Sequence, residues 1–406
     1  MTKLSPSLAR QAFSIKATRE LALRALPRSV FDFSDGGAED ERTLRRNEES
    51  FADFSLLPEP LKGAAQRDLS TVLFGRTLSM PVMIGPTGLA GLFWPDGERC
   101  AMRAAAAAGT AYCLSHGSVC TLEQLAGAAS PANRWMQVFI YRDRGFTREL
   151  AERAAATNYD ALVLTVDNQL LGNRERDIRN GFVIPPRLGP SEIAAMAYKW
   201  RWLWRMRNDL PRLTMGNNVT PGDTIGISEI AGQLASRLDP GMAWKDVDAL
   251  RSIWQGPLVL KGILSPLEAE EAVRRGVDAV IVSNHGGRQL DGAIASLDAL
   301  PRIVEVVAGR IPVLLDGGIR RGADVVKAIA LGATACLIAR PQLWGLAMGG
   351  QAGVAQVLEI YRREIDRTMG LCGVSTIAEI KRSLVFPNVS AKVLNHPAST
   401  TSANHA

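Results

Sequence analysis

The chain has 406 residues, of which 47% are apolar and 22% are charged, so it can bury a substantial core and is predicted to be globular. The net charge of +6 is modest and the Arg residues are spread along the sequence, which disfavours a nucleic-acid-binding protein. No run of about 18 apolar residues occurs, and the N-terminal MTKLSPSLARQAF lacks the apolar core of a secretory signal, so neither a membrane-spanning nor an exported protein is expected.

The five Cys residues form no CxxC pair and have no zinc-binding spacing. Cys113 and Cys336 lie in apolar runs, where buried and unreactive thiols are expected. This usage is typical of a reducing compartment, and we predict a cytoplasmic protein.

Residues 1–75 are predicted to form an N-terminal helical extension, which contains the stretch FDFSDGGAEDERTLRRN. Residues 76–390 are expected to hold the rest of the fold, and the polar tail 391–406 is expected to be disordered. The sequence thus predicts one domain over 1–406.

Eight short apolar runs follow, and each precedes a stretch of helical composition. They are PVMIG (81–85), AYCLS (111–115), WMQVFI (135–140), ALVLTV (161–166), PLVLK (257–261), DAVIVS (278–283), PVLLD (312–316) and ACLIA (335–339). The alternation predicts an α/β fold with a parallel sheet buried on both faces, and eight such strands close naturally into a (β/α)8 TIM barrel. The alternative is an open, doubly wound sheet, which would have a GxGxxG after the first strand; none follows it.

The connection between Thr165 and Lys261 holds 95 residues, where a single unit needs about 30. This predicts a long insertion, residues 185–245, on the fourth strand-to-helix loop. Within it, SEIAAMAYKWRWLWRMRN (191–208) has helical periodicity, and the apolar residues on one face are Ile193, Met196, Trp200, Leu203 and Trp204. With its flanking Lys and Arg, this helix suits the anionic inner face of the cytoplasmic membrane, and packing on the barrel or on a neighbouring subunit is the alternative.

In TIM barrels the carboxyl ends of the strands carry the chemistry, and nearly every polar residue of the apolar runs lies at that end. In chain order, the residues at these ends are Pro86, Thr87 and Gly88; Ser115 and His116; Gln137 and Phe139; Thr165 and Asp167; Lys261; Ser283, Asn284 and His285; Asp316, Gly317 and Gly318; and Arg340. Isolated buried polar groups do not account for so regular a pattern, so we expect a site at this mouth.

The last two units indicate the kind of ligand. DGGIRRG supplies a Gly pair and Arg320, Arg340 follows the eighth run, and the corresponding loops of such barrels commonly bind phosphate. Together with a base such as His285 and a cation such as Lys261, they predict a phosphorylated cofactor. No metal site is predicted, because His and carboxylate residues are too sparse there.

Three stretches now on the page carry a family resemblance: LPRSVFDFSDGGAEDERTLRRN (26–47), SNHGGRQLDG (283–292) and DGGIRRGADVVKAIALGA (316–333). They resemble the FMN-dependent L-2-hydroxy acid dehydrogenase and oxidase family, and look most like its L-lactate and mandelate dehydrogenases. The resemblance implies an FMN cofactor and oxidation of an L-2-hydroxy acid to the 2-oxo acid.

Transferred position by position, the resemblance implies that His285 is the active-site base and that Asp167 orients it. Lys261 matches the cation beside flavin N1 and O2. Arg174 and Arg288 match the two arginines that hold the substrate carboxylate. Whether the substrate hydrogen leaves as a proton or as a hydride stays open, because both routes need the same residues.

The remaining matches concern the cofactor. The flavin contacts implied are Pro86, Thr87, Gly88, Ser115, Gln137, Thr165 and Ser283; the ribityl contact is Asp316; and the phosphate site is Gly318, Arg320 and Arg340, preceded by Ala339 in place of the usual Gly.

Two further departures concern the substrate, because Phe33 and Phe139 stand where the family usually has Tyr. If each missing hydroxyl contributes about 0.5–1.5 kcal/mol, simple lactate-like acids lose about one to two orders of magnitude in recognition or turnover. A larger or more apolar substrate and a less active enzyme on the usual acids both fit this change.

Gly88 bears on the electron acceptor. Family members that react readily with oxygen tend to have Ala there, so Gly88 favours a dehydrogenase that passes electrons to a quinone or protein acceptor. An oxygen-reducing oxidase and a catalytically weakened FMN-binding barrel are the alternatives. The resemblance also suggests a homo-oligomer, such as a tetramer.

Overall fold

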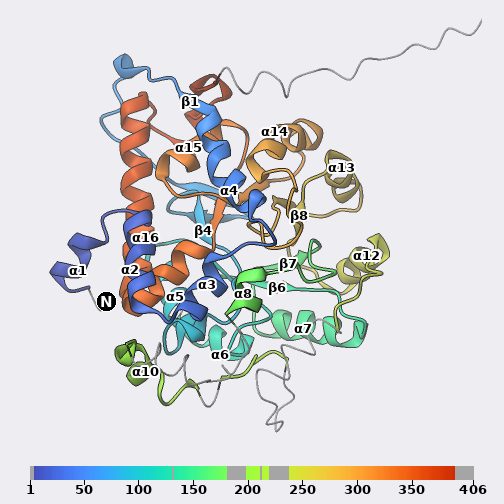
Figure 1. The fold of residues 1–406 in the computed structure, drawn as a ribbon. Coiled ribbons are helices and arrows are strands. Elements are labelled where there is room, and N and C mark those ends of the chain that lie inside the picture. Colours follow the sequence, from blue (N-terminus) through green and yellow to red (C-terminus); the bar gives the residue numbers. More distant parts are fainter. Residues whose placement is uncertain (1–3, 130–131, 181–197, 211–212, 219–236, 389–406) are drawn as a thin grey trace, which may run out of the picture.

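The computed structural model describes residues 4–129, 132–180, 198–210, 213–218 and 237–388, and at its centre a parallel barrel is wrapped in helices (Figure 1). In this part of the chain, eight strands pair in parallel, and β11 pairs with β4 to close the ring. They are β4 (Val82–Ile84), β5 (Ala111–Leu114), β6 (Asn133–Val138), β7 (Ala161–Thr165), β8 (Leu258–Ile263), β9 (Ala279–Val282), β10 (Val313–Asp316) and β11 (Ala335–Ile338). The closure confirms the predicted (β/α)8 barrel and excludes the open sheet.

A helix follows each strand along the chain. These helices are α5 (Gly97–Ala107), α6 (Leu122–Ala126), α7 (Arg144–Ala156), α12 (Trp244–Ile253), α13 (Pro266–Arg274), α14 (Ser296–Val307), α15 (Gly322–Ala330) and α16 (Arg340–Cys372). Helix α16 bends at Gly350, whose φ is +56° and whose missing side chain leaves room for the Trp94 indole. The bend therefore requires glycine both for conformation and for space.

Apolar side chains fill the lower part of the barrel. The inward-facing residues there include Met83, Cys113, Trp135, Val163, Val259, Ile281, Leu314 and Leu337. The β2–β3 hairpin (Thr71–Leu73 and Arg76–Leu78) contributes Leu73 and Leu78 to the same cluster. Because side chains alternate along a strand, the next inward position lies two residues further toward the carboxyl end. The apolar layer is therefore the floor of the site, and the next inward layer lies directly above it.

The N-terminal extension packs on one side of the barrel, and its α2 lies beside α16 (Figure 1). Its elements are α1 (Pro6–Gln11), α2 (Ile15–Ala25), α3 (Arg28–Asp35), α4 (Arg42–Glu49), the 3-10 helices Ser50–Asp53 and Pro60–Lys62, and β1 (Phe54–Leu56). The extension is thus helical as far as residue 53, and β1 then pairs antiparallel with β12 (Val385–Pro387). The sequence did not predict this pairing, because the two partners lie more than 300 residues apart.

The long insertion is described only in part. Helix α8 (Glu175–Arg179) precedes the predicted insertion 185–245, and α10 (Trp200–Met206) lies within it. Ile193, Met196 and the tail 391–406 lie outside the described residues. Within the described residues, no helix combines the length and apolar content that crossing a membrane requires.

Candidate active site

One ring of side chains lies two positions beyond the apolar floor of the barrel. Following the alternation of each strand from its floor residue, the ring consists of Ser115, Gln137, Thr165, Lys261, Ser283, Asp316 and Ala339. All seven belong to the cofactor contacts that the sequence predicted. The strand period therefore brings together, from seven strand ends, residues that are distant in the chain.

Lys261 is the charged centre of this ring. Its Nζ lies 3.0 Å from Asp316 Oδ2 and donates to Ser283 Oγ at 2.7 Å, and only 4% of the residue is exposed. Burial lowers the Lys261 pKa, but the negative charges of Asp316 and Asp167 outweigh it and raise the pKa overall. A fixed positive charge is therefore present at the mouth.

His285 and Asp167 form the second charged group. The Nδ1 of His285 lies 2.8 Å from Asp167 Oδ1. Burial lowers the pKa of His285, and the Asp167 charge only partly opposes this; for Asp167, burial is outweighed by His285 and Lys261, which lower its pKa. The imidazole is thus neutral near pH 7, with Nδ1–H donating to the carboxylate and Nε2 free to accept a proton.

The backbone around His285 is unusual. His285 has φ +57° and is followed by Gly286 at +64° and Gly287 at +73°. Left-handed backbone costs a non-glycine residue about 1–3 kcal/mol, so this turn persists only because its surroundings hold it.

Two partly buried arginines, Arg174 and Arg288, face the same region without an ion pair. Arg288 Nη1 donates to the carbonyl oxygens of Phe33 (2.7 Å) and Gly36 (3.0 Å), and Arg174 Nη2 donates to Gln289 Oε1 (3.3 Å). Neither guanidinium has a carboxylate within 4.0 Å among the described residues. Burial lowers the pKa of both, and for Arg288 the charge of Arg174 lowers it further. Two partly buried cations that form no close ion pair favour binding of an anion.

The two phenylalanines that replace the family's Tyr lie beside these groups. The Arg288 guanidinium stands 5.4 Å above the centre of the Phe33 ring, which gives it a cation–π contact. Phe139 is buried and packs edge-on against His116, with ring centres 4.4 Å apart. Both positions are therefore apolar walls.

The loop after β4 contains Pro86, Thr87 and Gly88. Gln342 of α16 donates its side-chain N–H to Thr87 Oγ1 at 2.6 Å, which fixes this loop from outside. A Cβ on Gly88 would lie 3.3 Å from the carbonyl oxygen of Gly117, so an alanine there needs a small shift of the neighbouring loop.

The predicted phosphate site lies after β10 and β11. Gly318 has φ +80° and packs so closely on the backbone of Asn47 that no side chain fits. Arg320 pairs with Glu48 at 2.9 Å, whereas Arg340 is buried and donates to the carbonyl oxygens of Ser34 and Gly36, both at 2.9 Å. Burial, followed by the charge of Arg320, lowers the pKa of Arg340 to about 10.

The residues present fit a flavin nucleotide. Thr165 Oγ1 and Asp316 Oδ1 are buried without a hydrogen-bond partner among the described residues, although both belong to the ring at the mouth. Flavin and ribityl groups offer the N–H, O–H and carbonyl partners that such atoms lack, and adjacent arginines suit a phosphate. Gly317 and Gly318 of the predicted phosphate loop both have positive φ, +97° and +80°, a conformation that glycine adopts without strain.

Comparison with known proteins identifies the family to which the chain belongs. The model of the family described as FMN-dependent dehydrogenase matches residues 22–387. The L-lactate dehydrogenase of Caulobacter sp. (strain K31) is 44% identical over 369 residues, which cover 90% of this chain and 96% of that protein. The L-lactate oxidase of a Nostoc species is also 44% identical, over 371 residues and with the same coverage.

Solved structures give the same answer. A crystal structure of the monotopic membrane protein (S)-mandelate dehydrogenase is 35% identical, has a TM-score of 0.89, and is matched over 93% of this chain and 99% of that one. The fold and site are those of an FMN-dependent oxidoreductase on a TIM barrel. The chain belongs to the FMN-dependent dehydrogenase family, and its cofactor is FMN.

Several residues that organise the site were missed by the sequence analysis. Gln289 donates to the carbonyl oxygens of Asp167 and Leu170, both at 2.8 Å, and so fixes the loop that leads to Arg174. His116, noted only as a strand end, packs against Phe139. The sequence did contain a hint of the role of Gln289, because this polar residue directly follows Arg288 in the same motif. The family resemblance gave no role to Gln289.

Proposed function

We propose that the protein oxidises an L-2-hydroxy acid to the corresponding 2-oxo acid, with His285 as the base. The observation that supports this best is the contact of His285 Nδ1 with Asp167 Oδ1 at 2.8 Å, beside two partly buried arginines that form no ion pair. Bound FMN would accept the two electrons that leave the substrate.

In this proposal Arg174 and Arg288 bind the substrate carboxylate. Arg288 uses Nη1 for backbone carbonyls, which leaves Nε and Nη2 without a partner among the described residues. These two N–H groups match the two oxygens of a carboxylate. The substrate hydroxyl then lies within reach of His285 Nε2, which takes its proton or the α-proton, and Asp167 stabilises the imidazolium that forms.

Lys261 supplies positive charge where the reduced cofactor would gain negative charge. Its raised pKa keeps it protonated across the physiological range. Ser115, Gln137, Thr165, Ser283 and Asp316 would hold the flavin and ribityl groups, and Gly318, Arg320 and Arg340 the phosphate.

We favour an electron acceptor other than oxygen, a quinone or a protein, because position 88 is glycine. A quinone acceptor is compatible with a peripheral membrane position.

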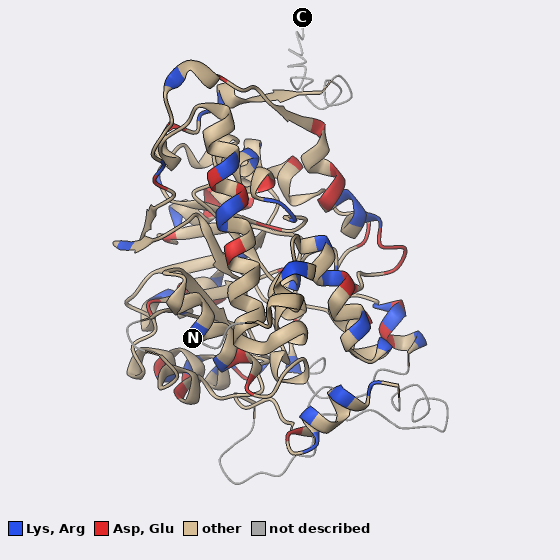
Figure 2. Ribbon diagram, turned by 90° about the vertical axis from the view of Figure 1, so that its left-hand side faces the viewer, with Lys and Arg blue, Asp and Glu red and all other residues tan. Residues whose placement is uncertain are grey.

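Helix α10 is the element that we propose to contact the membrane. Its Trp202 and Met206 are buried, whereas Trp200 and Trp204 are 61% and 65% exposed. Helix α10 contains Arg201 and Arg205 and no acidic residue, and it lies at the bottom of the molecule (Figure 2). Arg201 and Arg207 stack on the two exposed tryptophans, an arrangement suited to an anionic lipid surface.

Leu203 does not share that exposed face, because it is half-buried against the core. The docked helix is instead held by the Trp202 indole, which donates to Leu92 O at 3.3 Å, and by Lys199, which donates to Arg24 O at 2.6 Å. Flotation with anionic liposomes tests the membrane proposal. The parent is expected to float and the Trp200→Glu, Trp204→Glu variant to stay in solution; equal behaviour contradicts it.

Anaerobic stopped-flow mixing of the FMN-bound protein with aliphatic and aromatic L-2-hydroxy acids tests the reaction. At least one acid is expected to bleach the flavin absorbance, and the His285→Ala variant should bleach orders of magnitude more slowly. If none of the acids bleaches the flavin, the result favours the alternative of a catalytically weakened FMN-binding barrel. Fast reoxidation of the reduced flavin by dissolved oxygen would instead indicate an oxidase. Homo-oligomerisation, such as a tetramer, stays a prediction that light scattering can test.

A further inference from the structure

Asn47 of α4 and Asn284 of the loop after β9 join their side-chain amides in a reciprocal pair. Asn47 Nδ2 donates to Asn284 Oδ1 and Asn284 Nδ2 donates to Asn47 Oδ1, both at 2.8 Å. Only 2% and 4% of the two residues are exposed. Away from water, such a paired contact fixes the helix relative to the loop.

The Asn284 amide uses its full hydrogen-bonding capacity. Its Oδ1 also accepts from the Gly287 N–H at 3.1 Å, and its Nδ2 also donates to Ile294 O at 3.0 Å. An amide oxygen offers two lone pairs and its nitrogen two protons, so all four are engaged. Asn284 thereby closes the turn that contains His285.

That turn is the left-handed segment 285–287. The two glycines adopt positive φ freely, whereas His285 does not. Its N–H is held by Ser283 Oγ at 3.1 Å, and its ring is held by Asp167. The direction of the imidazole therefore depends on how firmly the turn is closed.

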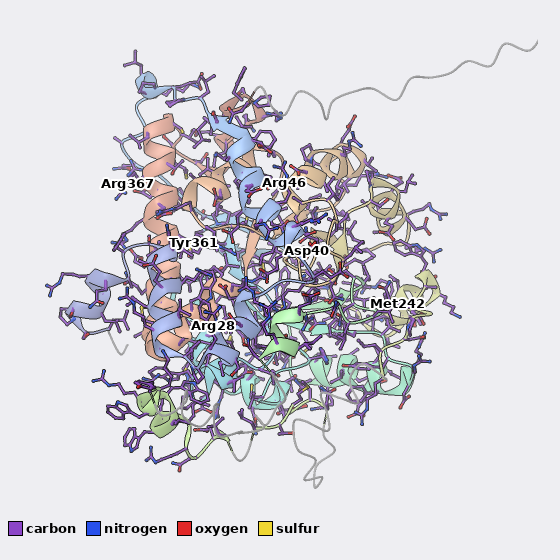
Figure 3. All side chains as sticks on the ribbon, viewed as in Figure 1. Arg28, Asp40, Arg46, Met242, Tyr361 and Arg367 are labelled. Carbon is purple, nitrogen blue, oxygen red and sulfur yellow. The ribbon has the colours of Figure 1, made fainter. Side chains whose placement is uncertain are left out.

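Helix α4 is anchored independently of the amide pair. The carboxylate of Asp291 accepts from the N–H groups of Thr43 (2.8 Å) and Arg42 (3.2 Å) at the start of the helix. Arg46, labelled in Figure 3, pairs with Asp298 of α14 at 2.9 Å. Asn47 is thus presented to Asn284 from a fixed helix.

We propose that Asn47 is a positioning residue for His285. Its side chain bonds to Asn284 and to the Ser296 N–H (3.3 Å), not to the imidazole, so it acts by holding the left-handed turn that keeps His285 against Asp167. The effect on catalysis rests on the proposed role of His285 as the base.

The variant Asn47→Leu approximately keeps the side-chain volume and removes both hydrogen bonds between the side-chain amides of Asn47 and Asn284. We expect kcat to fall by about 10- to 100-fold while KM changes much less, because the base and not the carboxylate clamp is displaced. The apparent pKa of His285 should also rise toward its ordinary value as water reaches the ring. Ring-labelled histidine NMR measures this pKa without substrate, and with only four His in the chain the signal is assigned by its loss in His285→Gln.

Thr43→Val is the matched control. Thr43 is equally buried on the same helix, but its hydroxyl is 3.4 Å from the carbonyls of Leu290 and Ala293, away from the turn. It should leave both kcat and the His285 titration unchanged. Asn284→Leu should reproduce the effect of Asn47→Leu, and the double variant should be little worse than either.

A folded, FMN-loaded Asn47→Leu protein with parental kcat and a parental His285 titration overturns the proposal. If Asn47→Leu does not fold, the same two measurements are made on Asn47→Asp. This variant keeps the oxygen that accepts from Asn284 and loses the N–H group that donates to it. If no acid bleaches even the parent, the proposed function fails, while the NMR titration still decides whether Asn47 positions His285.

Discussion

Lys261 Nζ and Asp316 Oδ2 stand 3.0 Å apart in the ring at the barrel mouth, where both residues are almost fully buried. The pair joins strands β8 and β10, which are not neighbours in the barrel. Two opposite charges from alternate strands therefore fix the ring across the barrel interior.

Removing both members of this pair should cost less than the sum of the two single losses. Asp316→Leu leaves Lys261 with less compensating charge, and breaking a buried pair typically costs about 3–5 kcal/mol. We expect Lys261→Met and Asp316→Leu each to lower the free energy of unfolding of the apoprotein in urea. The double variant should be more stable than the sum of the two losses predicts; strict additivity contradicts the coupling.

The buried His116 should make stability pH-dependent. Burial lowers its pKa to about 4, below the ordinary value of 6.5, so between these values the unfolded chain binds more protons than the folded one. Stability is therefore full above pH 6.5 and falls as pH drops toward 4, by about 3 kcal/mol for this residue. Urea unfolding at several pH values should show a flatter profile for His116→Gln; an unchanged slope contradicts this assignment.

Asp167→Asn should shift the acid limb of the pH profile. The Asp167 charge raises the His285 pKa against the effect of burial, so its removal lowers that pKa. Because the neutral imidazole is the proposed base, kcat/KM should persist to lower pH in the variant. At its plateau, kcat should be about 10²- to 10⁴-fold lower, since the base is weaker and the imidazolium unsupported. A shift toward higher pH is the result that conflicts with this account.

Phe33→Tyr and Phe139→Tyr restore the two family hydroxyls. If the substrate is a small acid, each should raise kcat/KM by about 2- to 10-fold, from roughly 0.5–1.5 kcal/mol per hydrogen bond. If the natural substrate is larger and apolar, Phe139→Tyr should instead lower kcat/KM, because the added hydroxyl would have to be buried against an apolar group of the substrate. Steady-state kinetics with lactate and mandelate separates the two cases.

Gln289→Leu should weaken substrate binding. Gln289 ties Asp167 and Leu170 through Nε2 and accepts from Gly172 and Arg174 through Oε1. Without it the loop that carries Arg174 loses four hydrogen bonds, so KM should rise by about 10-fold or more. The neighbouring exposed Leu290→Ala serves as control and should leave KM unchanged; equal effects argue against the role of Gln289.

The sequence by itself determined the barrel and most of its chemistry. Eight apolar runs with polar residues at one end predicted both the closed sheet and the ring that contains Lys261 and Asp316, because strand period and chain direction are local properties. The motif around His285 likewise supplied the proposed base and one arginine of the proposed carboxylate clamp.

Tertiary structure alone decided what holds these groups in place. The amide pair of Asn47 with Asn284, and the docking of α4 by Asp291, join segments more than 200 residues apart. No local sequence pattern predicts such pairs, because the hydrogen-bond partner of a buried Asn side chain depends on which distant segment lies beside it in the folded protein. The buried face of α10 was likewise decided by tertiary contacts. Trp202 is buried and Trp200 is exposed, and the helical period alone does not distinguish a face that packs on the protein from one that faces solvent.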